Sequence, residues 1–187
     1  KLEPLKQYLG LTDAQLKKIV VGKPQVLGLN HDSLVKEKLE PLQQYLGLTR
    51  AELKKIVLVH PAILGYNHAN LITKLALYKK HMALTDEGLK EAVLVQPAIL
   101  GYGHIEAKWE LLRSGFAPEP GEQGDAHLKV FGPPPRVFGV GKERLEERLG
   151  ELEALLGGKP RASEWLRPVV LWSPEKWRAA VLDPTSE

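Results

Sequence analysis

The chain has 187 residues, of which 43% are apolar, with a formal net charge of +3 and no cysteine. This composition is typical of a folded protein, and it excludes a disulfide framework, a thiolate metal site and a thiol nucleophile. No apolar run is long enough for a membrane-spanning helix. The charge is uneven, because residues 1–103 hold 14 Lys/Arg against 9 Asp/Glu, a basic excess typical of nucleic-acid-binding proteins.

One sequence pattern occurs three times, over residues 1–31, 38–68 and 74–104. Lys1 recurs as Lys38 and Lys74, in steps of 37 and 36 residues, and the first two copies are identical at 22 of 31 positions. A period of this length indicates a repeat array, in which each copy buries its apolar face against its neighbours. The array favours recognition along an extended surface over chemistry in a pocket.

The second copy shows the elements of one repeat. Apolar residues at helical spacing predict a first helix over residues 34–46 that ends near Gly47, and Pro41 should kink or split it. Thr49 and Glu52 form a capping box, which predicts the start of a second helix. This second helix should end by His60, because a following proline disfavours helical backbone.

The other copies vary this plan. The first copy repeats the capping box as Thr12 and Gln15, whereas the third retains Thr85 but has Gly88 at the partner position, so its second helix should begin less firmly. The segment 61–65 is too short for a third full helix and predicts one 3₁₀ or helical turn. Asn67 should then cap the next helix.

The ordered motifs of the second copy, Leu-Gly-Leu-Thr at 46–49, Leu-Lys-Lys-Ile-Val at 53–57 and His-Pro-Ala-Ile-Leu-Gly-Tyr at 60–66, resemble the mitochondrial transcription termination factor (mTERF) family. The resemblance covers residues 1–103 strongly. It implies an all-α fold, an α-solenoid or superhelix of repeats with two helices and a short 3₁₀ or helical turn each, and a basic groove. It also implies an organellar protein, mitochondrial or alternatively chloroplast.

The expected organisation is a single elongated repeat domain over residues 1–187. Its repeats cover about 1–37, 38–73 and 74–107, followed by an irregular repeat at 108–141 and capping helices at 142–187. The irregular repeat contains an exposed loop at 117–125, a shortened helix at 126–131 and a proline turn at 135–139. Three C-terminal tryptophans are expected to close the core rather than to stack on bases: Trp165, Trp172 and Trp177. Because the chain begins in mid-repeat without methionine, we expect it to be processed or incomplete.

Basic residues recur on the second helices. Their apolar neighbours take the buried face, so the lysines should point outward and form a stripe of phosphate contacts when the repeats stack. The alternative is an ordinary solvated face. The candidate residues are Lys17, Lys18, Lys54, Lys55 and Lys90.

A second recurring column lies at the starts of the first helices, where free amides and the helix dipole favour an anion. A basic side chain at such a position also suggests phosphate binding, and the alternative is surface drift after duplication. The residues are His31, His68, His104 and Lys142. No metal site is expected, because the histidines lie one per repeat without carboxylates at ligand spacing.

No catalytic pattern is present. The chain lacks the local signatures of a Ser/His/Asp triad, and the glycine-lysine sequence at 139–142 is not followed by the serine or threonine of a phosphate loop. We therefore predict a protein that is not an enzyme, with no cofactor, no small-molecule substrate and no membrane partner.

The mTERF resemblance and the basic repeat array together predict an organellar nucleic-acid-binding protein of gene expression. A free-standing duplex binder that neutralises roughly 6–10 phosphates should carry more excess charge than +3, and the three repeats contain a single arginine, Arg50. Structured RNA (rRNA), contacted through its backbone, is therefore favoured over duplex DNA, with a role as a mitochondrial ribosome-associated subunit and ribosomal proteins as further partners. The alternatives are a transcription termination factor on double-stranded DNA and a protein-binding helical scaffold.

Overall fold

The computed structural model describes residues 2–118 and 136–182, and every regular element within these ranges is a helix. Backbone contacts divide the chain into two compact units, Lys1–Tyr102 and Gly103–Glu187. The single elongated domain expected from the sequence stays a prediction. In the described part of the chain, no helix has the length and apolar character needed to cross a membrane.

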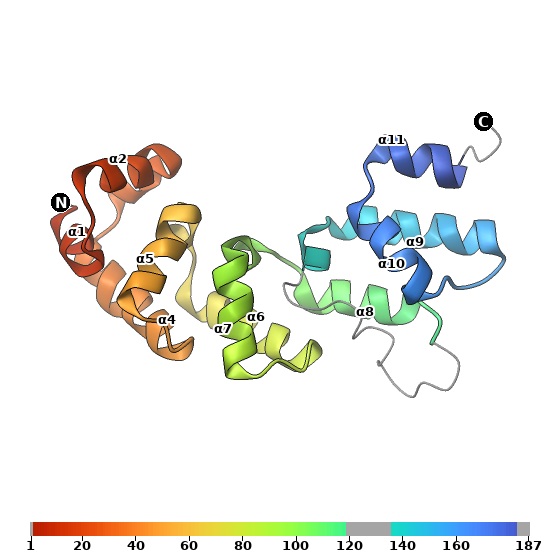
Figure 1. Ribbon diagram of the computed structural model, residues 1–187, viewed down its shortest axis with the longest axis horizontal. Coiled ribbons are helices and arrows are strands. Elements are labelled where there is room, and N and C mark those ends of the chain that lie inside the picture. Colours follow the sequence, from red (N-terminus) through yellow and green to blue (C-terminus); the bar gives the residue numbers. More distant parts are fainter. Residues whose placement is uncertain (1, 119–135, 183–187) are drawn as a thin grey trace. The chain divides into compact units, whose positions relative to one another are not determined.

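The first unit consists of three consecutive repeats of two helices and a 3₁₀ turn, as the sequence predicts (Figure 1). The first repeat contains α1 (Glu3–Leu9), α2 (Asp13–Gly22) and η1 (Pro24–Gly28). The second contains α3 (His31–Leu34), η2 (Val35–Leu39), α4 (Glu40–Tyr45), α5 (Arg50–Val59) and η3 (Pro61–Gly65). The third contains α6 (His68–His81), α7 (Asp86–Val95) and η4 (Pro97–Gly101).

The first helix of the second repeat is split as Pro41 predicts. It runs from α3 through the π-helical segment η2 into α4, and Pro41 lies in the first turn of α4. Proline has no amide hydrogen to donate to the preceding turn, and the wider π turn accommodates this missing bond. The third repeat has Leu77 at the same position, and its first helix, α6, is a single helix of 14 residues.

The second helices begin at the predicted caps. The Thr12 hydroxyl accepts from the Gln15 amide at 3.2 Å while the Thr12 amide donates to Gln15 Oε1 at 3.0 Å, and Thr49 and Glu52 repeat this exchange. In the third repeat the Thr85 hydroxyl accepts from the Gly88 amide, but glycine has no side chain to return the bond. Half of the capping box is thus missing at the start of α7, and the weaker start stays a prediction.

The first helices end in left-handed backbone at equivalent positions of the three repeats. Gly10 and Gly47 have φ of 60° and 59°, and Ala83 takes the same place with φ of 48°. In each case the next amide reaches back to a carbonyl of the last helical turn, as the Leu84 amide does to the Lys79 carbonyl at 3.1 Å. Only Ala83 carries a Cβ in this conformation, and the Cβ makes it strained.

Replacing Ala83 with glycine is therefore expected to stabilise the protein. Relief of the left-handed strain outweighs the greater freedom of an unfolded glycine, and the free energy of unfolding should rise by about 0.5–1 kcal/mol. Ala76→Gly, on the exposed face of α6, is the control and should lower it by about 0.5–1 kcal/mol. Urea unfolding followed by circular dichroism measures both changes, and a destabilised Ala83→Gly chain would contradict the strain argument.

The core of the first unit follows the repeat. Each second helix buries the same apolar position, occupied by Ile19, Ile56 and Ala92, and each 3₁₀ turn buries Val26, Ile63 or Ile99. Tyr78 is fully buried in α6, and its hydroxyl donates to the Ile99 carbonyl at 3.0 Å. Burial raises the pKa of Tyr78 far above its ordinary value, so the hydroxyl remains a donor in this contact.

The second unit contains α8 (Ile105–Gly115), η6 (Arg136–Gly139), α9 (Lys142–Leu156), α10 (Ala162–Leu171), α11 (Pro174–Trp177) and η7 (Arg178–Leu182). The predicted loop at 117–125 and helix at 126–131 fall almost wholly outside the described residues. The proline turn of the irregular repeat is present as η6. Trp177 is buried and lies edge-on to Trp172, with ring centroids 6.4 Å apart. The expected role in closing the core is thus confirmed for Trp177, whereas Trp165 and Trp172 are only partly buried.

Candidate nucleic-acid interface

The lysine pairs of the first unit lie on consecutive second helices that pack side by side, α2 against α5 and α5 against α7. Each of these positions follows a capping threonine. Leu53 and Ile56 are buried beside Lys54 and Lys55. The structure therefore brings the predicted lysine positions into one series of neighbouring helices. The two members of each pair, however, have different surroundings.

The first member of the pair binds the preceding repeat. Lys54 Nζ donates to the Gly10 carbonyl at 2.5 Å, and Lys90 Nζ donates to the Gly47 carbonyl at 3.0 Å. We call these two contacts the inter-repeat clamps. Lys90 Nζ also lies 3.0 Å from Glu52 Oε2. The Thr49 amide and Lys90 together keep the pKa of Glu52 below its usual value.

The clamps follow from helix electrostatics. Gly10 and Gly47 end first helices, where carbonyls have no partner within the helix and the helix dipole is negative. An ammonium group is the natural partner for such a carbonyl. Lys54 and Lys90 are accordingly only partly exposed, which differs from the expectation that they point freely outward.

The remaining lysines of this series are exposed. They are Lys17, Lys18 and Lys55, and none has a hydrogen-bond or ion-pair partner among the residues that the structure describes. In the third repeat Glu91 takes the place of Lys18 and Lys55. The free positive charge therefore lies on α2 and α5.

The second predicted column begins the first helices, as expected, but its members differ. His31 and His68 are the first residues of α3 and α6, and the His31 side chain lies outside the described part of the structure. His68 Nδ1 is buried without a hydrogen-bond partner in the described structure. The other two members belong to the second unit: His104 is the N-cap of α8 with φ of 57°, and Lys142 begins α9 with Nζ 3.5 Å from Glu146 Oε2.

Sequence reasoning missed a set of buried or partly buried basic side chains that bind main-chain carbonyls. Lys74 Nζ donates to the Leu100 carbonyl at 3.3 Å, and Lys108 Nζ donates to the Phe138 carbonyl at 2.8 Å. Leu100 and Phe138 occupy the same place in their proline turns. Burial lowers the pKa of both lysines. The signal was available, since a lysine followed by an apolar residue recurs at the start of each copy.

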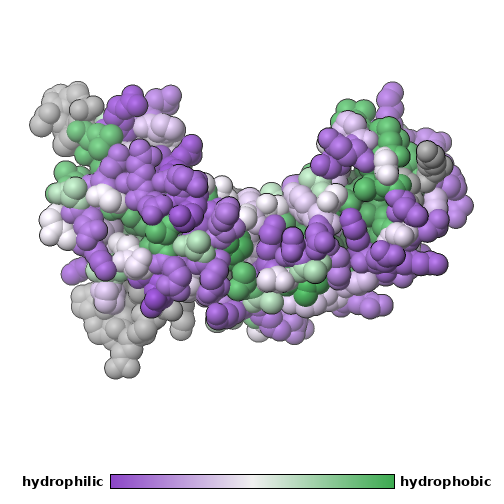
Figure 2. Space-filling view, turned by 180° about the vertical axis from the view of Figure 1, so that it is seen from behind, coloured by the Kyte–Doolittle hydropathy of each residue, from purple (hydrophilic) through white to green (hydrophobic). Residues whose placement is uncertain are grey.

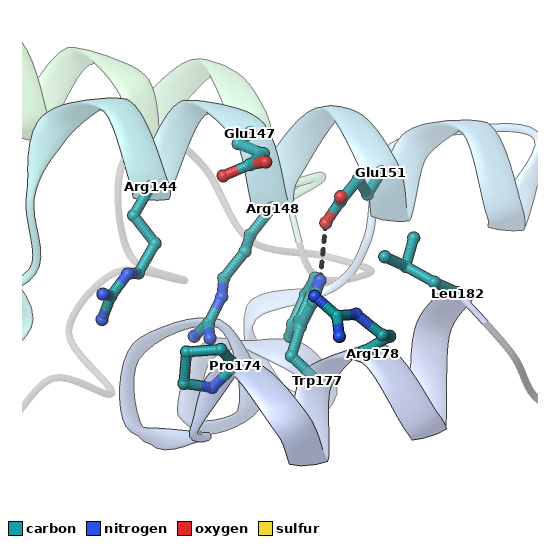
Figure 3. A pocket seen from close by; sticks show the side chains of 8 residues that line it. All are labelled: Arg144, Glu147, Arg148, Glu151, Pro174, Trp177, Arg178 and Leu182. Atoms are coloured by element: carbon teal, nitrogen blue, oxygen red, sulfur yellow. Dashed lines mark hydrogen bonds between the residues drawn. The ribbon is translucent and has the colours of Figure 1, made fainter.

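Arg148 of α9 also binds main-chain carbonyls, in this case at the end of α10. It is 3% exposed, and its guanidinium donates to the carbonyls of Val169 and Trp172 at 2.7 and 2.9 Å. The guanidinium also lies 4.7 Å from the ring centroid of Trp177, whose indole N–H donates to Glu151 (Figure 3). Desolvation lowers the pKa of Arg148.

A cleft of about 270 Å³ surrounds this arginine. It is lined by Arg144, Glu147, Arg148, Glu151, Pro174, Trp177, Arg178 and Leu182 (Figure 3). Acidic and basic side chains share the cleft, and its central cation is already bound to carbonyls. The arrangement stabilises the fold, and it lacks the uniform positive lining of a phosphate site.

Comparison with known proteins decides the family. The mTERF family model matches residues 1–109. The chain belongs to the mTERF family. No curated protein matches the chain in sequence. The matched region ends within α8, so it contains the complete first unit with all three clear repeats.

Family membership confirms the resemblance and the all-α repeat solenoid predicted from the sequence. Proteins of the mTERF family are organellar, built of helical repeats, and generally nucleic-acid-binding regulators rather than enzymes. Within the described part of this mTERF chain, His, Asp and Glu side chains nowhere gather into a group that could hold a metal ion.

Proposed function

We propose that this mTERF protein binds structured RNA through the phosphate backbone, as a non-enzymatic component of organellar gene expression associated with the mitochondrial ribosome. The observation that carries the proposal is the exposed lysine surface on α2 and α5. Lys18 and Lys55 occupy the same position in successive repeats, are exposed, and are engaged by nothing in the described structure. Stacked helices thus present free ammonium groups at repeat spacing, which suits a sugar-phosphate backbone.

The arginine content supports RNA over sequence-specific duplex DNA. Arginine provides the commonest specific contact to base edges in the major groove, and Arg50 is the only arginine of the three repeats. Its guanidinium lies 5.0 Å from the ring centroid of Tyr8 in the neighbouring repeat. Tyr8 in turn donates to Gln43 Oε1 at 2.7 Å. Arg50 is therefore engaged in packing between repeats, and Lys17, Lys18 and Lys55 are exposed lysines suited to phosphates.

The test is the double charge reversal Lys18→Glu and Lys55→Glu, measured by fluorescence anisotropy on a folded rRNA hairpin and on duplex DNA. Removing two phosphate contacts should reduce the slope of log K against log salt by roughly 1.5–2. Affinity for the hairpin should fall by about ten- to a hundredfold near physiological salt. Both positions are exposed and lie outside the clamps, so the circular-dichroism spectrum and Tm should not change.

The control is Lys36→Glu with Lys38→Glu, which alters net charge equally at two positions on the first helix of the second repeat, outside α2 and α5. It should lower affinity much less. Unchanged RNA affinity in the Lys18/Lys55 variant would contradict the proposal. Tighter binding to duplex DNA than to the hairpin would support a termination factor, and no salt-dependent binding to either would support a protein scaffold.

The ribosomal association has its own experiment. The native protein in an organelle lysate should sediment in a sucrose gradient with a large particle, and RNase treatment should release it to the top. Slow sedimentation that RNase does not alter would contradict the ribosomal association. RNA binding itself would still be tested by the anisotropy measurement.

A further inference from the structure

A histidine and a tyrosine lie together where the second repeat packs on the third. His60 ends α5 and Tyr66 follows η3, and His60 Nε2 lies 3.0 Å from the Tyr66 hydroxyl oxygen. Hydrophilic side chains spread over the surface of the repeats in Figure 2, whereas this pair is partly buried. A Cβ on Gly101 of η4 would lie 2.6 Å from the Tyr66 oxygen and 3.4 Å from His60 Nε2. The pair is therefore part of the packing of η3 on η4, which we call the turn joint.

The third repeat makes the same contact with a side chain that does not titrate. Gln96 is the counterpart of His60. Its amide donates to the hydroxyl of Tyr102, which is the counterpart of Tyr66. A neutral amide is thus sufficient for this contact in the same fold. Histidine adds one property, the ability to take up a proton near neutral pH.

The surroundings of His60 disfavour its charged form. Burial lowers the pKa of His60, and no carboxylate in the described part of the chain pairs with it. Protonation would make Nε2 a donor, so that Tyr66 could no longer donate to it. The neighbouring elements offer no compensating negative charge, because the ionisable side chains that they place beside the two turns are Lys23 at the end of α2, His68 and Lys74 of α6, and Tyr102 after η4.

We propose that the His60–Tyr66 contact makes the turn joint pH-sensitive, closed while His60 is neutral and loosened when His60 takes up a proton from solvent. Loosening lets water reach the imidazolium, which the closed joint keeps partly desolvated. The joint lies between the second and third repeats, whereas Lys18 and Lys55 lie on the first and second. This inference therefore does not rest on RNA binding.

The sign of the pH dependence follows from the lowered pKa. An open joint exposes His60, whose pKa then has its ordinary value of 6.5. The open state therefore takes up a proton at a higher pH than the closed state does. The closed joint keeps its full stability above the pKa of the open state and loses stability as pH falls through it. The loss levels off below the pKa of the closed state.

Amide exchange and a histidine titration, both followed by NMR between about pH 5 and 8, test the turn joint. The amides of Ile63, Tyr66, Ile99 and Tyr102 make the hydrogen bonds of the two turns, and their protection factors report its opening. Protection should be constant above about pH 7.5 and fall at lower pH. Each unit between 6.5 and the pKa measured for His60 should correspond to a tenfold loss of protection. The titration thus fixes the size of the loss in advance.

His60→Gln copies the contact of the third repeat and is the decisive variant. Its protection factors should equal those of the unmodified protein near pH 7.5 and stay constant down to about pH 5. His81→Gln, which removes another histidine of the first unit, is the control and should retain the pH dependence. The same loss of protection in His60→Gln, or a folded-state pKa of His60 at or above 6.5, would overturn the proposal. If His60→Gln opens at every pH, the unmodified protein decides, because its loss of protection must match the measured pKa of His60.

Discussion

Replacing Arg148 with methionine is expected to lower the free energy of unfolding of the second unit by about 3 kcal/mol. The two carbonyls that it binds, those of Val169 and Trp172, lie at the C-terminal end of α10, where helix carbonyls lack partners of their own. Hydrogen bonds from a charged donor contribute about 1.5–3 kcal/mol each, and a buried acceptor left unpaired is costly. Methionine would fill much of the space but donate to neither carbonyl.

Urea unfolding followed by tryptophan fluorescence measures this effect, because the Arg148 guanidinium lies over the Trp177 ring and donates to the main-chain carbonyl of Trp172. Arg144→Met is the matched control: it removes the same group from an exposed position on the same helix and the same cleft, and should change stability by no more than about 0.5 kcal/mol. The free energy of unfolding of Arg148→Lys should lie between those of the two methionine variants, because a single ammonium group replaces the planar guanidinium. Equal stability of Arg148→Met and the unmodified protein would contradict the role given to this residue.

Replacing Gly101 with alanine is expected to destabilise the first unit by about 1–3 kcal/mol through overpacking. A Cβ at this position would lie 2.6 Å from the Tyr66 hydroxyl oxygen and 3.4 Å from His60 Nε2. Tyr66 is restrained, because its hydroxyl lies 3.0 Å from His60 Nε2 and Lys74 Nζ lies 5.6 Å from its ring centroid. The turn η4 approaches η3 here so closely that a methyl group does not fit.

A second substitution separates steric conflict from loss of backbone freedom. Tyr66→Phe removes the hydroxyl, and the nearest ring atom is then 3.4 Å from the new Cβ, so it should restore most of the stability lost in Gly101→Ala. Gly28 is the equivalent glycine of the first repeat, and a methyl group added there would have no atom within 4 Å. Gly28→Ala should therefore be nearly neutral. If Gly28→Ala costs as much as Gly101→Ala, close packing of the turns is not the cause.

Local features of the fold could be predicted from the sequence. The capping boxes at Thr12 and Thr49, the split at Pro41 and the 3₁₀ turns depend on residues a few positions apart. Hydrogen bonds of this kind are determined by neighbours in the chain, so their sequence patterns are informative. Repetition then indicated that the copies stack.

The candidate site was less predictable, because its state depends on contacts between repeats. Recurrence showed which lysines share a column, but not how far one repeat rotates on the next. That rotation directs Lys54 and Lys90 to the neighbouring C-cap carbonyls and leaves Lys18 and Lys55 exposed. The acceptors are backbone atoms, which carry no residue-specific signal. The same reason hid the roles of Lys108 and Arg148. Their carbonyl partners lie 30 and 21 residues away, in the turn η6 and at the end of α10.

The inter-repeat clamps have a consequence for how such an array can change in evolution. The lysine of one repeat binds a main-chain oxygen of another, so the receiving repeat contributes only a helix end in left-handed conformation, which even Ala83 adopts. No matched pair of side chains has to be inherited together at this contact. A duplicated, deleted or exchanged repeat would therefore meet a compatible neighbour at once, and the copies could diverge on their outer surfaces without losing their ability to join.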